Sequence, residues 1–211
     1  MGDLDYDYNE HYRTMFPHFG MCMQSANSNF AFVPVPRCGS SYLLKYLHDD
    51  CGWKPYNYHF ILEKQFFSIV RDPYKRWLSG LWAIADPDPN SDIVKKAVDL
   101  QNKEAVIKMF DNPGLQNHHT MLQYLFFRDL DISKITFFNF DDPNFFTTIK
   151  HFFTNSLGLD VSTMSEWHSS DEKVEIKKII ESYGEDNLNK LKKWLDQDYK
   201  FLEQIKFYEA N

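Results

Sequence analysis

The stretch Phe30–Leu44 constrains the fold of this chain more than any other. Its first residues are apolar, as in a short buried strand, and its last residues place leucines at helical spacing. Between them lie Arg37, Gly39, Ser40 and Ser41. Because the first amides of a helix have no intrahelical partners and carry the positive end of its dipole, a loop with these residues predicts a phosphate site. Gly39 lets the backbone come close to the anion.

A second strand-to-helix junction lies in residues 66–80. An apolar strand ends at Arg71, Asp72 is a capping residue, and Pro73 suits the first helical position because its missing N–H costs nothing there. Arg71 at the strand end and Ser79 two turns into the helix can bring a guanidinium and a hydroxyl to one phosphate.

The two junctions together resemble the motifs of a known family. A P-loop nucleoside triphosphatase would need Gly-x-x-x-x-Gly-Lys-Ser/Thr, which this chain lacks. The sequence instead resembles the sulfotransferase family: Pro36–Ser41 matches its 5′-phosphosulfate loop, Pro-Lys/Arg-x-Gly-Ser/Thr-Ser/Thr, and Arg71–Ser79 matches its 3′-phosphate motif, Arg-Asp-Pro-x-x-Arg-x-x-Ser. Less specific resemblances are residues 117–123 to its His-x-x-x-Gln helix start, 135–142 to its late strand, and 195–201 to its terminal Asp-Tyr helix.

The resemblance implies an α/β fold with a central parallel β-sheet flanked by helices and a P-loop-like phosphosulfate-binding loop. It implies transfer of a sulfuryl group from 3′-phosphoadenosine 5′-phosphosulfate (PAPS) to an acceptor hydroxyl on a carbohydrate or small molecule, without a metal. The nucleotide product would be adenosine 3′,5′-bisphosphate. Arg37 would be catalytic, because a fixed guanidinium stabilises charge on the departing phosphate. The implied cofactor-binding residues are Arg37, Cys38, Gly39, Ser40, Ser41, Arg71 and Ser79.

The base that takes the proton of the acceptor hydroxyl has three candidates, His59, Glu63 and His119. His59 lies between the two motifs, shortly before the second strand, where carbohydrate-sulfotransferase relatives carry a basic residue. A neutral imidazole also accepts a proton near pH 7 without a large pKa shift. We therefore expect His59 to be the catalytic base. The alternative for His59 is a partly buried histidine among aromatic neighbours.

Other functions stay open at this point. Cys38 lies inside the phosphate loop, where amides and Arg37 would depress a thiol pKa, so a reactive thiol is one alternative, although no base accompanies it. A second is a nucleotide-binding protein of the same fold that has lost catalysis. A third is a nucleotide-dependent phosphotransferase, which would need the missing lysine and a magnesium-binding acid.

Composition limits the possible classes further. The 211 residues are 43% hydrophobic and 17% aromatic, which suits one domain with a sizeable core. A formal net charge of −7 argues against binding to nucleic acid or to an anionic membrane. The three cysteines lack the spacing of a metal site, and the acidic N-terminal residues are unlike a targeting signal, so we expect a reducing, cytoplasmic location.

The order of elements follows from periodicity and turn residues. We expect a single domain over residues 1–211, with an irregular arm at 1–29, a nucleotide-binding core at 30–84 and an acceptor-side segment at 85–211. Further expected elements are a short helix at 8–15, helices at 41–48, from 73, from 91, at 116–127 and 144–157, a strand at 134–140, and a helical region at 171–207.

Overall fold

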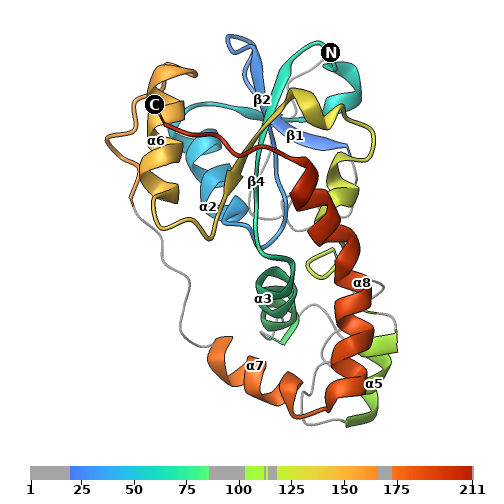
Figure 1. Ribbon diagram of the computed structural model, residues 1–211. Helices are drawn as coiled ribbons and strands as arrows, with labels where there is room; N and C mark the ends of the chain where they lie inside the picture. Colours follow the sequence, from blue (N-terminus) through green and yellow to red (C-terminus); the bar gives the residue numbers. More distant parts are fainter. Residues whose placement is uncertain (1–19, 86–102, 112, 114–117, 166–172, 211) are drawn as a thin grey trace.

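The computed structural model describes residues 20–85, 103–111, 113, 118–165 and 173–210. Its centre is a five-stranded sheet with the strand order β3-β1-β2-β4-β5 (Figure 1). β2, β4 and β5 are parallel, whereas β1 is antiparallel to both β2 and β3. The α/β class is therefore confirmed, but the sheet is mixed, not parallel. The strands are β1 (Met21–Gln24), β2 (Phe30–Val33), β3 (Lys54–Asn57), β4 (Gln65–Val70) and β5 (Ile135–Asn139).

The antiparallel strand β1 corrects the prediction of an irregular arm up to residue 29. Met23 of β1 pairs with Phe32 of β2 across a short turn, where the Ser28 N–H donates to the Ser25 carbonyl. Cys22 and Met23 are both buried. Because β1 has only four residues, its pairing depends on neighbouring strands more than on its own periodicity. The rest of the predicted arm, including the helix at 8–15, lies outside the described residues.

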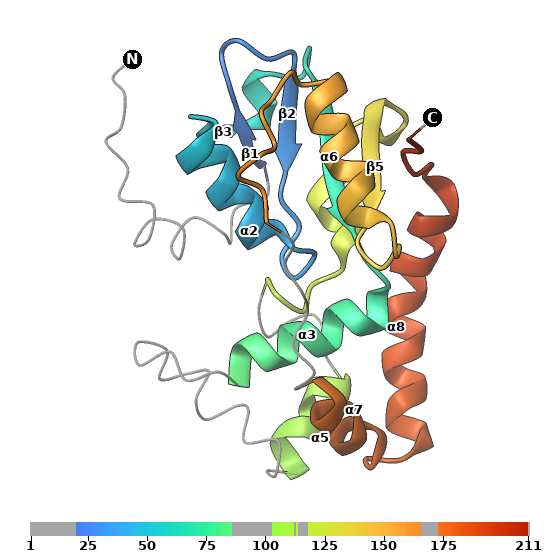
Figure 2. The ribbon, with the colours of Figure 1, turned by 90° about the vertical axis from the view of Figure 1, so that its left-hand side faces the viewer.

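Helices cover the sheet and form a second body of the molecule (Figures 1 and 2). The α-helices are α2 (Ser40–Lys45), α3 (Pro73–Ala85), α5 (Lys103–Asp111), α6 (Phe145–Asn155), α7 (Lys173–Glu181) and α8 (Glu185–Gln204). Shorter helical segments are the π-helix η1 (Tyr46–Asp50) and the 3₁₀ helices η2 (Tyr58–Phe60), η3 (Gln123–Phe127) and η4 (Ile132–Lys134). No helix among these is long and apolar enough to cross a lipid bilayer.

Successive phenylalanines of β5 pack against different layers because side chains alternate between the faces of a strand. Phe138 contacts Phe152 of α6, with ring centroids 5.1 Å apart. Phe137 contacts Phe127 of η3 at 5.2 Å and Phe201 of α8 at 5.7 Å. α2 and α6 lie on one face of the sheet, and Figure 2 shows them in front of it. The upper end of α8 lies on the other.

A second hydrophobic cluster lies below the sheet, where α3, α5, α7 and α8 meet (Figure 1). Leu81, Val106 and Ile180 are fully buried there. α8 supplies Leu191 and Leu195 to this cluster and then continues to the sheet. One long helix therefore belongs to both cores.

Several further predicted elements are confirmed, and the helix expected at 116–127 is wrong. The helices expected from residue 73 and at 144–157 are α3 and α6, and the expected late strand is β5. The region 171–207 holds two helices, which Gly184 separates at a φ of 90°. Of the helix expected at 116–127, the described residues 118–127 form only the 3₁₀ helix η3, and the Asp198 carboxylate accepts the N–H groups of its first two residues. The helix expected from residue 91 begins outside the described residues.

Candidate functional site

Three parallel strands end at the same edge of the sheet, and a charged residue follows each of them. Arg37 lies in the loop after β2, Arg71 directly follows β4, and Asp141 follows β5. The carboxyl edge of a parallel sheet is where α/β proteins usually bind ligands. The fold therefore collects both predicted motifs at one edge.

The loop after β2 turns sharply into α2. Arg37 has a φ of 67° and Gly39 a φ of 74°, so two residues of this short loop lie in the left-handed region. Glycine adopts that conformation freely, but an L-residue such as arginine does so at a cost. The surrounding structure holds Arg37 in this conformation, which directs its side chain towards α3.

The N-terminus of α2 has the features expected of an anion site. The first helical hydrogen bond runs from the Leu43 N–H to the Gly39 carbonyl, so the amides of Ser40 and Ser41 precede it. The N-cap residue is Gly39, which has no side chain to accept from these amides. The side chain of Ser40 is buried and that of Ser41 is exposed. Backbone N–H groups and an exposed hydroxyl there can donate hydrogen bonds to an anion.

A direct contact joins the two motifs. The Arg37 Nε donates to the Ser79 Oγ at 3.2 Å, and Ser79 is buried on α3. The next residue, Gly80, packs so closely against the segment at His119 that an added Cβ would lie 2.8 Å from the His119 carbonyl carbon. Because Gly80 has no Cβ, α3 can pack directly against the backbone of His119 while Ser79 contacts Arg37.

Arg71 is buried and held in place on the β4 side of the site. Its Nε lies 3.3 Å from Asp141 Oδ1, and its guanidinium stacks over the Phe140 ring at 5.0 Å. Asp141 also pairs with the exposed Lys75 at 3.3 Å. Because the ion pair uses Nε, the terminal nitrogens of Arg71 can still donate to a phosphate.

Arg76 occupies the centre of the site, although the sequence assigned it no firm role. It is 1% exposed, and one terminal nitrogen donates to the carbonyls of Pro36 and His119, both at 3.3 Å. Burial lowers the pKa of its guanidinium. Arg76 therefore fastens the loop before Arg37 to the segment that carries His119.

His119 lies close to the loop cations. Its pKa is lowered to about 2, mainly by burial and in smaller part by His118, Arg37 and Arg76. The rings of His118 and His119 are in contact, with centroids 4.0 Å apart and the planes tilted by 40°. The imidazole of His119 is therefore neutral over the physiological pH range, and it belongs to the Arg37 neighbourhood.

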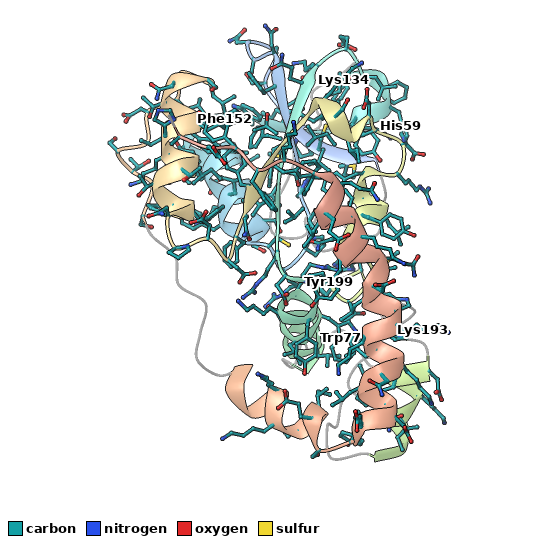
Figure 3. All side chains as sticks on the ribbon, in the orientation of Figure 1. His59, Trp77, Lys134, Phe152, Lys193 and Tyr199 are labelled. Atoms are coloured by element: carbon teal, nitrogen blue, oxygen red, sulfur yellow. The ribbon has the colours of Figure 1, made fainter. Side chains whose placement is uncertain are left out.

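The structure does not bring His59 to this group. Its Nε2 lies 3.8 Å from Asp129, and its backbone N–H donates to the Asn57 side chain. In Figure 3 His59 lies in the upper part of the molecule, where Lys134 precedes β5, and well apart from Tyr199, whose hydroxyl contacts Asp72. Glu63 belongs to the same segment before β4 and is exposed. Nearness to the second motif in sequence therefore did not place His59 near it in space.

Cys38 differs from its predicted environment. Its side chain is fully buried in the core beneath the loop, and burial raises its pKa to about 12, against the lowering effect of Arg76 and Arg71. The expectation that the loop depresses this pKa is wrong, because desolvation outweighs the neighbouring cations. Its backbone N–H donates to the Val35 carbonyl at 3.4 Å. Cys38 therefore anchors the loop to the hydrophobic core through its buried side chain.

Asp141 is a site residue that the sequence reasoning missed. The signal that could have found it is its position just after a parallel strand, on the edge where the two arginines lie. Among the residues that the structure describes, no three His, Cys, Asp or Glu side chains gather where they could share a metal ion.

Comparisons with known proteins do not assign the chain to a family. No family model, curated protein or solved structure matches the chain. The fold and the site define an α/β protein whose sheet edge holds Arg37, Arg71 and Arg76 beside a helix N-terminus.

Proposed function

We propose that this protein is a sulfotransferase that moves the sulfuryl group of PAPS to an acceptor hydroxyl, on a carbohydrate. The observation that carries the proposal is the contact of 3.2 Å between Arg37 Nε and Ser79 Oγ. These residues belong to the two sequence motifs that resemble the 5′-phosphosulfate and 3′-phosphate sites of the family. Two cations on separate strand ends, Arg37 and Arg71, suit a ligand with two separate phosphate positions.

Each residue has a distinct role in this proposal. Amides at Gly39–Ser41 and the Arg37 guanidinium hold the 5′ side, and Arg71 and Ser79 hold the 3′-phosphate. As the sulfur–oxygen bond to the departing phosphate breaks and a bond to the acceptor oxygen forms, negative charge grows on the departing oxygen. Arg37 stabilises that charge without proton transfer. This is a positional and electrostatic form of catalysis.

The acceptor's proton needs a base, and the position of His119 favours it over His59. Arg37 and Arg76 lie close enough to His119 to lower its pKa. Its imidazole is neutral, and one nitrogen of a neutral imidazole is a proton acceptor. A doubly charged anion bound beside it would raise its pKa and make it a better base. The predicted role of His59 has no comparable support from its surroundings.

Two rival functions use the same fold. A phosphotransferase would bind a nucleoside triphosphate with magnesium, and the loop offers no lysine for a terminal phosphate. A binding protein without catalysis would hold the nucleotide but transfer nothing.

Titration calorimetry separates these functions. We expect adenosine 3′,5′-bisphosphate to bind and ATP with magnesium to bind more weakly. Tight binding of ATP that requires magnesium would support the phosphotransferase. Incubation with PAPS and a panel of glycans then distinguishes enzyme from binder, because only the enzyme transfers labelled sulfate. Binding of neither nucleotide would overturn the proposal.

A further inference from the structure

The side chain of Gln123 holds the backbone of Arg71 from both sides. Its Oε1 accepts the Arg71 N–H at 3.2 Å, and its Nε2 donates to the Arg71 carbonyl at 2.8 Å. Gln123 is 0% exposed. An amide paired with both backbone groups of one residue does what a neighbouring strand would do. It therefore extends the ordered part of β4 by one residue, to the cation itself.

Gln123 is in turn held by the C-terminal helix. The Asp198 carboxylate on α8 accepts the N–H groups of Gln123 at 2.8 Å and of Tyr124 at 3.0 Å. Asp198 is 0% exposed, so these hydrogen bonds are shielded from water. The buried contacts thus run from α8 through η3 to the end of β4.

The next residue of α8, Tyr199, contacts Asp72, which directly follows Arg71. The Tyr199 hydroxyl donates to Asp72 Oδ2 at 3.2 Å, and the other carboxylate oxygen of Asp72 accepts the Lys75 N–H at the start of α3. Adjacent residues of one helix therefore fix both Arg71 and Asp72. Asp198 and Tyr199 are the Asp-Tyr pair whose resemblance had no physical role in the sequence analysis.

We infer that Gln123 is a positioning residue for Arg71, and that α8 sets the geometry of the 3′-phosphate side of the site through Asp198. The inference rests on the proposed function. Asp141 and Phe140 limit where the Arg71 guanidinium can point, but only a fixed backbone makes that direction reproducible. Loss of the Gln123 amide would leave the buried N–H and carbonyl of Arg71 without these partners and let the backbone at Arg71 move.

The test compares two nucleotides that differ only in the 3′-phosphate. Gln123→Met keeps the length of the side chain and removes both hydrogen bonds. We expect it to weaken binding of adenosine 3′,5′-bisphosphate about tenfold, and that of adenosine 5′-monophosphate less than about twofold. In an Arg71→Ala background the same change should have no further effect on the bisphosphate, because the guanidinium it positions is gone.

Ser68→Ala is the matched control. Ser68 is buried in β4 and donates to the Val33 carbonyl at 2.6 Å, so its loss removes one buried hydrogen bond away from Arg71. It should leave the ratio of the two nucleotide affinities unchanged. If Gln123→Met does not fold, Gln123→Asn, which keeps an amide on a shorter side chain, takes its place, and the same loss of 3′-phosphate preference is expected.

The outcomes separate this inference from the proposed function. A wild-type protein that binds neither nucleotide, or binds both equally, overturns the proposed function and the inference with it. A preference for the bisphosphate that Arg71→Ala abolishes and Gln123→Met retains overturns the inference alone. An equal loss for both nucleotides in Gln123→Met also overturns it, because that pattern indicates a general structural role.

Discussion

Arg37 combines an unfavourable backbone conformation with a specific side-chain contact. Its φ of 67° costs an L-residue on the order of 1 kcal/mol, and its Nε reaches Ser79 on another element. Strain of this kind persists only where the surrounding structure enforces it. At the residue scale, the effects of the backbone and of the guanidinium can be separated by mutation.

Replacement of Arg37 tests whether its guanidinium acts on the reaction. Arg37→Ala should lower turnover by about 10²-fold, with a smaller loss of nucleotide affinity, and Arg37→Lys should recover part of the rate. Arg37→Gly should match Ala in rate but be more stable by about 1 kcal/mol, since glycine accepts the left-handed φ. Steady-state kinetics and urea unfolding measure these effects. Equal losses of affinity and turnover would make Arg37 a ground-state clamp.

His119 predicts how stability depends on pH. In the folded protein its pKa is lowered to about 2, whereas an unfolded histidine titrates near 6.5. The unfolded chain therefore binds the proton first, and stability is complete above about pH 6.5 and lost as the pH falls towards 2. His118, whose pKa burial lowers to about 4, acts in the same direction.

Urea unfolding between pH 7.5 and 5 measures this effect. The free energy of unfolding should fall by up to about 1.4 kcal/mol per pH unit for His119 in the lower part of that range. His119→Gln removes that titration, so its stability should change less with pH. The same slope in the wild type and the variant would contradict a buried neutral His119.

At the scale of elements, α3 approaches the rest of the site at Gly80. Alanine normally stabilises a helix interior by about 1 kcal/mol relative to glycine. Here a Cβ would clash with the backbone of His119, so Gly80→Ala should instead destabilise the protein by about 1–3 kcal/mol and lower activity.

Chemical denaturation and a transfer assay on one preparation check the effect of Gly80→Ala. Gly52→Asn is the control: Gly52 has a φ of 70° and open space around it, and asparagine tolerates that φ. It should change stability little. A Gly80→Ala variant as stable as the wild type would mean that α3 can shift freely.

The elements that the sequence could predict are those whose ends are marked by proline and glycine residues close by in the chain. Pro36, Gly39 and Pro73 mark the two strand-to-helix junctions, so α2 and α3 follow from neighbouring residues alone. The meeting of Arg37 and Ser79 follows from the rule that parallel strands end at one edge.

The missed features depend on contacts between distant segments. β1 and β3 are short strands that form by pairing: β1 pairs with both β2 and β3, and β3 lies at the edge of the sheet. η3 stands where an α-helix was predicted, and its first two amides donate to Asp198, far along the chain. His59 was misplaced for a similar reason, because a segment through β3 and η2 carries it away from the loop. No local pattern contains this information.

At the scale of the whole molecule, α8 joins two cores. Leu195 is buried in the cluster below the sheet, where α3, α5, α7 and α8 meet, and Phe201 is buried in the core that includes the strands of the sheet. Because one continuous helix contributes to both, loss of packing in either should be felt by the other. The two clusters should therefore unfold together.

Differential scanning calorimetry tests that coupling. Leu195→Ala should cost about 2–5 kcal/mol and Phe201→Ala about 3–5 kcal/mol, and each should move one common transition to lower temperature. Two separate heat-absorption peaks, each shifted by only one of the variants, would show that the clusters unfold independently.

The two edge strands of the sheet, β3 and β5, determine whether folded molecules can pair with one another through their sheets. Exposed strand edges recruit further strands, which is one origin of fibrils. On one edge, β3 carries Lys54 and Pro55, and proline has no N–H to offer an incoming strand. On the other, the C-terminal segment lies along β5, where Phe207 bridges to Phe137 and the Tyr208 N–H donates to the Phe137 carbonyl at 2.8 Å. Strand addition between folded chains is therefore obstructed at both edges, so aggregation would first require one of them to open.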